Sequence, residues 1–155
     1  MVKAETLVPL VVTIHLAATF YMVGLVWFVQ RVHYPLFAGV GARHFSAYER
    51  AHVLRTGPVV GPAMLIEAAT ALALLGLPLP HVPRIVPWLG AGLLVVIWLS
   101  TWGLQVPRHR DLSTGFEPRA HRRLVATNWI RTCAWSLRGL LLLWMVRAAW
   151  ASAAP

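Results

Sequence analysis

The last quarter of the chain joins a basic stretch to a long apolar run, and this feature most constrains the fold. PRAHRRLVATNWIRT leads into CAWSLRGLLLLWMVRAAW, which predicts one helix from about Pro118 to Trp150. At about 1.5 Å per residue this helix is about 48 Å long, whereas the hydrocarbon core of a bilayer is about 30 Å thick. We therefore expect a transmembrane helix whose first, basic turns project beyond one membrane face.

Polar side chains recur along this helix at steps of seven, three, four and three residues: His121, Asn128, Arg131, Trp135 and Arg138. Such steps place the side chains on one helical face. Polar groups that face lipid are costly, so the stripe predicts that other helices cover it.

The composition agrees with an integral membrane protein. The 155 residues are 58% hydrophobic and only 12% charged, with a mean hydropathy of +0.64, whereas a soluble domain has about 25% charged residues. Apolar runs predict spans at about residues 7–30, 59–77, 87–106 and 124–150. We expect one all-α domain over residues 1–155, a four-helix transmembrane bundle.

Prolines are expected to separate the helices. Pro35 should end the first span and Pro107 the third, because the residue before a proline disfavours helix. Gly57-Pro58 should break the chain before the second span. Residues 43–55 then predict a separate amphipathic helix on the membrane surface, and Pro118 suits the first turn of the last helix.

Basic residues gather at the ends of the apolar segments rather than over a soluble surface, which disfavours binding to nucleic acid. Nine arginines follow the first and third spans: Arg31, Arg43, Arg50, Arg55, Arg108, Arg110, Arg119, Arg122 and Arg123. The opposite side offers Lys3, Arg84 and Arg147. The positive-inside rule then predicts a bacterial cytoplasmic (inner) membrane protein with both termini on the periplasmic side.

Two charged residues project to the middle of the bilayer. Glu67 lies in the second predicted span and Arg138 in the fourth, and an unpaired charge at that depth costs about 2.5–3.5 kcal/mol. We expect Glu67 and Arg138 to form an ion pair, directly or through one water. The pair is either a structural contact between helices or part of a proton or substrate site.

Five of the seven histidines fall near the predicted cytoplasmic face: His33, His44, His52, His109 and His121. They suggest a metal, haem or quinone site, because imidazole is a common metal ligand. Alternatively, interfacial histidines simply face headgroups and cap helices. His15 in the first span could ligate haem or the magnesium of a chlorin, or bond to a neighbouring helix. The spacing fixes no metal site, so the cofactor stays open.

Several motifs carry a resemblance to a known family. They are His15 in the first span, Tyr34-Pro35, Tyr48 with His52, Pro62 with Glu67, and Asn128-Trp129-x-Arg131 in the last helix. With them the chain resembles small bacterial four-helix membrane proteins similar to the anthrone-oxygenase-like domain family. The resemblance covers most of the chain. It implies four spans and oxygenation without a cofactor, with His52 or His121 as the base.

Two functions are suggested by these observations. The first, which we favour from the sequence, is an accessory subunit that docks on a larger respiratory or photosynthetic membrane complex. Small residues would let partner helices approach: Ala17, Ala18, Gly24, Gly139, Ala148 and Ala149. A transporter is disfavoured, because the chain shows no inverted repeat with broken helices.

The second function is a membrane oxidoreductase or oxygenase that binds an aromatic or quinone-like substrate at the cytoplasmic mouth. The expected ligand-binding residues are His33, Tyr48, His52, Arg55, Asn128, Arg131 and Trp135. The catalytic candidates among the mouth residues are His52, His121 and Arg131. Arginine would hold a substrate oxyanion and histidine would move a proton. Trp98, Trp102 and Trp135 could stack on a flat ligand or serve packing alone.

Overall fold

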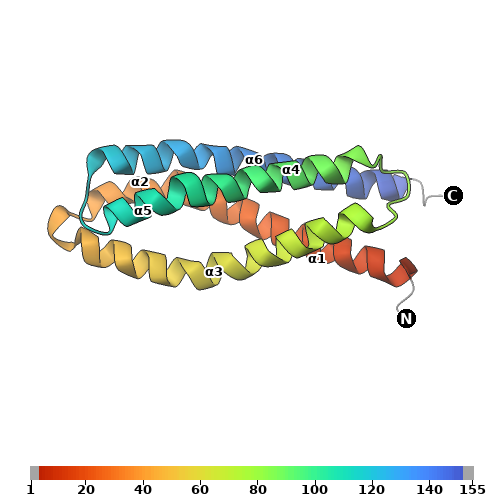
Figure 1. Ribbon diagram of the computed structural model, residues 1–155, viewed down its shortest axis with the longest axis horizontal. Coiled ribbons are helices and arrows are strands. Elements are labelled where there is room, and N and C mark those ends of the chain that lie inside the picture. Colours follow the sequence, from red (N-terminus) through yellow and green to blue (C-terminus); the bar gives the residue numbers. More distant parts are fainter. Residues whose placement is uncertain (1–3, 152–155) are drawn as a thin grey trace.

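A computed structural model describes residues 4–151, which form four long helical rods running up and down the bundle (Figure 1). The first rod joins α1 (Ala4–Phe28), the π-helix η1 (Val29–His33), α2 (Tyr34–Leu36) and the 3-10 helix η2 (Phe37–Gly39). The second rod is α3 (Ala42–Gly76). The third joins α4 (Ile85–Ser100), the π-helix η3 (Thr101–Gln105) and α5 (Val106–Leu112), and the fourth is α6 (Pro118–Ala151). The all-α expectation is confirmed.

The rods differ in how apolar they are. Within the described residues, three helical stretches are long and apolar enough to cross a membrane: Leu7–Gly39, Ala42–Gly76 and Ile85–Leu112. The fourth rod, α6, has the necessary length but carries arginines along much of it. The structure thus supports a helical bundle with three candidate spans, and the fourth crossing stays a prediction.

The helix ends expected at Pro35 and Pro107 are wrong, because both rods continue through these prolines. In each case a π turn comes first. The N–H of Tyr34 donates to the carbonyl of Val29, and the N–H of Val106 donates to that of Thr101. A proline ring clashes with the carbonyl four residues earlier, and we attribute the continuity to the wider π turn, which relieves that clash.

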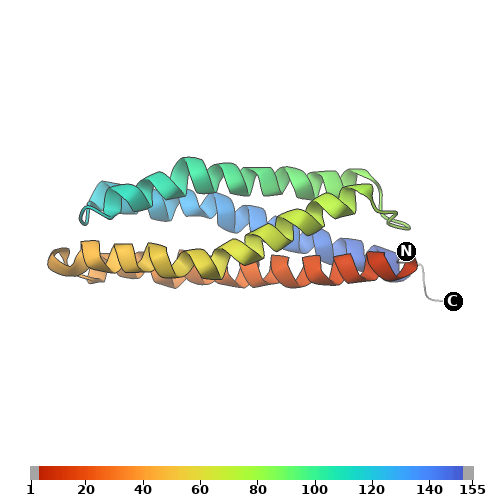
Figure 2. The ribbon, with the colours of Figure 1, turned by 60° about the horizontal axis from the view of Figure 1, so that its bottom comes forward.

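The break expected at Gly57-Pro58 is also wrong, and residues 43–55 are no separate surface helix. They form the first part of α3, which runs without interruption from Ala42 to Gly76. Both prolines inside α3, Pro58 and Pro62, follow a glycine. Glycine has no Cβ to clash with the proline ring, so helical geometry survives before each proline. Figure 2 shows α3 changing direction in this region, as prolines cause.

The start of α6 agrees with the prediction that Pro118 opens the last helix. Glu117 stands just before it. Its carboxylate accepts hydrogen bonds from the backbone N–H of Arg119, at 2.8 Å, and from that of Ala120. These two bonds stabilise the charged carboxylate and hold the pKa of Glu117 below its ordinary value of 4.5.

The core consists of apolar layers separated by polar ones. The central apolar cluster holds Met22, Val26, Met64, Ile97, Ala134 and Trp135. A second cluster, at the end of the bundle where α2 and α5 lie, holds Tyr34, Phe37, Phe45, Leu112, Ala120 and Leu124. The third, at the opposite end, holds Val82, Val86, Leu142 and Met145. Polar side chains between these clusters therefore face protein, as the stripe on α6 predicts.

One of the small residues expected to dock a partner is used inside the bundle. Gly139 is buried, and a Cβ at this position would meet Val23 at 3.4 Å and Phe20 at 3.5 Å. The missing side chain thus lets α6 approach α1. Ala18 is buried too, at 8% exposure.

Candidate functional site

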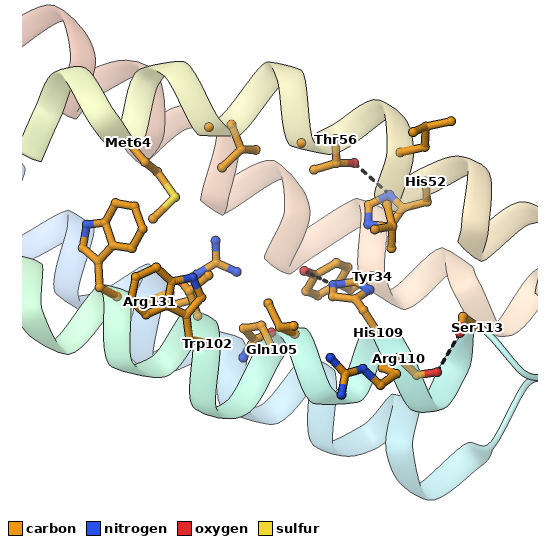
Figure 3. Close-up of a pocket in the computed structure, with 18 of the residues that line it drawn as sticks. Tyr34, His52, Thr56, Met64, Trp102, Gln105, His109, Arg110, Ser113 and Arg131 are labelled. Atoms are coloured by element: carbon orange, nitrogen blue, oxygen red, sulfur yellow. Dashed lines mark hydrogen bonds between the residues drawn. The ribbon is translucent and has the colours of Figure 1, made fainter.

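A cavity of about 820 Å³ lies between α3 and the third rod. This volume is typical of small-molecule sites. Most of its lining is apolar: Val53, Leu54, Val60, Met64, Leu65, Trp98, Trp102 and Val106. Figure 3 shows the side chains that reach into it from both helices. The bend in α3 lies beside this cavity, since Gly57 and Gly61 line it.

A chain of three polar side chains forms part of the wall. The Tyr34 hydroxyl lies 2.9 Å from Nε2 of His109, and Nδ1 of His109 lies 2.5 Å from a carboxylate oxygen of Glu49. A consistent assignment has Nδ1–H donating to Glu49 and Nε2 accepting from the tyrosine. Tyr34 and His109 line the cavity, while Glu49 is fully buried behind them.

Two further histidines complete a cluster with His109. Nε2 of His33 lies 2.9 Å from Nδ1 of His52, and the Thr56 hydroxyl lies 3.1 Å from that same nitrogen. The ring centroids of His52 and His109 are 5.2 Å apart. Across the part of the chain that the structure describes, no group of three or more His, Cys, Asp or Glu side chains is arranged to hold a metal ion.

The π turns position two of the cavity residues. Tyr34 directly follows η1, and Gln105 is the last residue of η3. The extra residue of a π turn rotates the downstream part of the helix around its axis, and π turns are frequent at functional sites. The carbonyl of Tyr34 accepts a hydrogen bond of 2.8 Å from Nε2 of His121, which fixes this turn to α6. His121 therefore holds Tyr34 in place rather than facing the cavity.

Arg131 is the charged residue deepest in the wall. It is 8% exposed, and its guanidinium donates to Oδ1 of Asn128 at 3.2 Å and lies 5.2 Å from the ring of Trp135. Asn128 is held in turn by Gln30, to whose Oε1 it donates at 2.9 Å. The Asn-Trp-x-Arg element thus supplies a buried positive charge to a largely apolar cavity, which Arg50 and Arg110 line as well.

A second polar cluster lies deeper in the bundle, away from the cavity. Arg138 Nε lies 3.0 Å from Oε1 of Glu67, so the structure brings this expected ion pair together. Glu67 also accepts from Thr19 at 3.0 Å and from Trp135 at 2.9 Å. His15 lies beside the pair, 3.5 Å from Arg138, and its other nitrogen contacts Thr70.

The other candidate residues lie elsewhere. Tyr48 packs against Phe37 at 5.5 Å between ring centroids, and Arg55 is exposed on α3. Neither lines the cavity, and neither do Asn128 and Trp135, which are fully buried behind Arg131. The structure groups His52 and Arg131 with Trp98 and Trp102, two of the three tryptophans suggested as stacking residues, and with Tyr34 and Gln105, which were not proposed as ligand-binding.

Sequence reasoning missed Tyr34, Glu49 and Gln105 as site residues. Glu49 was missed because residues 43–55 were expected to form a helix on the membrane surface, where a carboxylate is hydrated and needs no hydrogen-bond partner in the protein. Tyr34 and Gln105 were hidden because their prolines suggested helix ends. The one available signal was a tyrosine, a histidine and a glutamate near the same predicted membrane face.

Comparison with known protein families, with curated proteins and with solved structures finds no match for this chain.

Proposed function

We propose that this small helical membrane protein is an enzyme. It binds a flat, lipid-soluble aromatic molecule in the cavity and transfers a proton from that molecule to its own side chains. The observation that carries the proposal is the Tyr34–His109–Glu49 chain in the wall of a largely apolar cavity. Trp98 and Trp102 offer aromatic surface to the same space. Such a combination of apolar walls and a few convergent polar groups is typical of a ligand site.

The proton would move in two coupled steps. The Tyr34 oxygen takes a proton from an acidic C–H or O–H group of the ligand, while the tyrosine's own proton passes to Nε2 of His109. Glu49, bonded to Nδ1, stabilises the imidazolium that forms. The ligand is left as an anion and His109 as a cation, so charge is conserved. This is the acid–base part of the oxygenase or quinone chemistry suggested by the sequence.

The cavity would open to the lipid of the cytoplasmic leaflet. Arg50 bridges its outer end through a 3.5 Å contact with the carbonyl of Ser113, whereas Val53, Leu54 and Trp102 on its rim are exposed and apolar. A lipid-soluble ligand would enter from the side. In this arrangement α6 makes the fourth crossing, and the histidine cluster lies towards the cytoplasm, in line with the arginine distribution.

The subunit role favoured from the sequence stays a prediction. Its argument rests on small residues, and Gly139, one of them, packs against α1 within the bundle. The cavity provides a specific observation for the enzyme role that the subunit role lacks.

The test uses the purified protein in lipid nanodiscs and 2-tetralone, a bicyclic aromatic ketone with acidic C–H groups. Exchange of these hydrogens for deuterium is followed by mass spectrometry. We expect the protein to accelerate exchange over empty nanodiscs, and Tyr34→Phe and His109→Gln to lower the rate by about 100-fold, since general acid–base catalysis contributes at least that much. His44→Gln, an exposed histidine elsewhere on α3, is the control.

The location of the reaction is tested with a matched pair of substitutions on α3. Val53 lines the cavity and is 47% exposed, while Val59 is 49% exposed and does not line it. Val53→Trp should block exchange and Val59→Trp should leave it unchanged. Exchange no faster than in empty nanodiscs, or equal in wild type and Tyr34→Phe, would contradict the proposal.

A further inference from the structure

A second cavity, of about 350 Å³, lies beside the connection between α3 and α4. We call it the connection cavity. Its wall consists of the last residues of α3, the connection itself and the first turn of α4, and it shares no lining residue with the cavity that holds Tyr34 and His109. Figure 1 shows this connection at the end of the bundle where α1 begins and α6 ends. The volume lies within the range of ligand sites, about 300–1,000 Å³.

The connection is held in one conformation, so the cavity is preformed. The N–H of Val82 donates to the carbonyl of Leu79 at 3.2 Å, and the N–H of Val86 donates to that of Pro83 at 3.0 Å. Val82 is buried and belongs to the apolar cluster that joins this connection to α6. Prolines at positions 78, 80 and 83 restrict the backbone further. A preformed site loses little conformational entropy when a ligand binds.

Arg84 supplies the positive charge of the wall, and none of the carboxylates described in the structure pairs with it. Each of them is engaged elsewhere: Glu49 with His109, Glu67 with Arg138, Asp111 with Arg108, and Glu117 with the start of α6. A guanidinium binds phosphate through two parallel hydrogen bonds, so Arg84 is complementary to a phosphate group.

The position of Arg84 matches the depth of lipid phosphates. Trp88, which is 60% exposed, lines the same cavity, and tryptophan is enriched at the boundary between headgroups and hydrocarbon. At about 1.5 Å per residue, Arg84 stands about 6 Å closer than Trp88 to the end of the bundle. The guanidinium is therefore placed among headgroups when the tryptophan lies at that boundary.

The end of α3 supplies the opposite polarity. The last carbonyls of a helix lack partners within it and carry a partial negative charge. The carbonyl of Leu74 has its usual donor position occupied by Pro78, which has no N–H. Among the described backbone groups that follow α3, the N–H of Leu77 donates back to Ala73, at 3.2 Å, and none donates to Leu74. Leu74 and Pro78 both line the cavity, which therefore has carbonyl acceptors at one side and a guanidinium at the other.

We propose that the connection cavity binds the phosphoethanolamine headgroup of a phospholipid, with the phosphate on Arg84 and the ammonium group on the carbonyls that end α3. The ammonium brings three N–H donors to these acceptors. The acyl chains continue along the apolar surface of α4, where Ile85 and Leu89 are exposed. In the proposed orientation this lipid belongs to the periplasmic leaflet. The site is a lipid-binding function separate from the proposed enzyme.

The first test is native mass spectrometry of the full chain in detergent, titrated with dioleoyl phosphatidylethanolamine or dioleoyl phosphatidylcholine. Both lipids are zwitterionic and share their acyl chains, but the choline group has no N–H donor. We expect the first phosphatidylethanolamine to bind about fivefold more tightly than phosphatidylcholine. Equal affinity for the two lipids would overturn the proposal.

Substitutions locate the site. Arg84→Gln should weaken binding of phosphatidylethanolamine by about tenfold. Arg147→Gln, an exposed arginine at the same end of the bundle that does not line the cavity, is the control. Leu75→Trp should fill the cavity and remove the preference, while Leu72→Trp, outside the cavity on the same helix, should keep it. If Arg84→Gln weakens phosphatidylglycerol more than phosphatidylethanolamine, the site is one for anionic lipid and the headgroup assignment is wrong.

A second measurement needs no substitution. Phosphatidylethanolamine with a diazirine near the start of one acyl chain is photolysed with the wild-type protein in phosphatidylcholine nanodiscs. The label should fall on residues 74–88, and added unlabelled phosphatidylethanolamine should suppress it where the same amount of added phosphatidylcholine does not. Suppression to the same extent by both lipids would overturn the proposal. Because the two cavities share no residue, Arg84→Gln should leave hydrogen exchange of 2-tetralone unchanged, and loss of exchange would contradict two separate sites.

Discussion

Two buried carboxylates of this protein illustrate different uses of charge. Glu67 has both oxygens occupied, by Arg138, Thr19 and Trp135, and its contacts join α1, α3 and α6. Glu49 has one oxygen on His109, and its second oxygen lacks a partner within the described chain. A carboxylate whose oxygens all have hydrogen-bond partners fixes helices to one another. A carboxylate with an unpartnered oxygen can still accept a proton or a hydrogen bond from a ligand.

The hydrogen-bonded network around Glu67 predicts a large effect on stability. Glu67→Gln removes the counter-charge of Arg138 within the bundle and should lower the free energy of unfolding by about 3–5 kcal/mol. The double variant Glu67→Leu with Arg138→Met removes both charges and should cost less than either single change. Unfolding in detergent, followed by circular dichroism, measures these differences. Single variants that are no less stable than the double variant would contradict a structural ion pair.

At the scale of the helices, four internal prolines shape the cavity. Two follow glycine in α3, and two follow π turns in the first and third rods. A proline cannot donate to the carbonyl four residues earlier, so each one weakens the helix locally. The bend of α3 is a consequence of this pattern, and so are the directions in which the side chains of Tyr34 and Gln105 point after their π turns. The prolines therefore do not end helices here but open a space between them.

Replacing Pro58 and Pro62 by alanine tests this account. The carbonyls of Leu54 and Pro58 would regain hydrogen-bond donors, so α3 should straighten towards the third rod and the cavity should narrow. We expect binding of 2-tetralone to fall by about tenfold, while thermal stability stays equal or rises. The control is Ala69→Pro, an exposed position deeper in α3, which should cost stability instead. Unchanged binding in the double alanine variant would contradict the link between the bend and the cavity.

The helical rods arise from apolar runs of sufficient length, and the polar stripe of α6 correctly indicates which face is covered. The continuity through Pro35, Gly57-Pro58 and Pro107 could not be predicted, because local preference at a proline disfavours helix and the outcome depends on a glycine or a π turn beside it. The contact of Tyr34 with His109 joins residues 75 positions apart. No local pattern encodes such a pairing, so the relay emerges only from the packing.

At the scale of the whole molecule, the two connections flanked by arginine-bearing helix ends lie at one end of the bundle, and the beginning of α1 and the end of α6 lie at the other (Figure 1). The histidine cluster and the cavity lie towards the basic end. In the proposed orientation, this arrangement would place the polar site near the cytoplasmic headgroups and the Glu67–Arg138 pair nearer the middle of the membrane.

The orientation is tested by single cysteines in a Cys133→Ser background, labelled with a membrane-impermeant maleimide in vesicles of both orientations. Thr114→Cys, between α5 and α6, should react only from the cytoplasmic side. His81→Cys, before α4, and Arg147→Cys, near the end of α6, should react only from the periplasmic side; all three positions are exposed. Labelling of Thr114→Cys and Arg147→Cys from the same side would exclude a fourth crossing.

The central claim, that a lipid-soluble aromatic ligand occupies the cavity between α3 and the third rod, is tested most directly by photolabelling with benzophenone in nanodiscs. Mass spectrometry of the labelled peptides should locate the label on residues 53–65 and 98–106, and Val53→Trp should remove it while Val59→Trp does not. Label spread equally over the lipid-facing surfaces of α1 and α6, and unaffected by Val53→Trp, would contradict the claim.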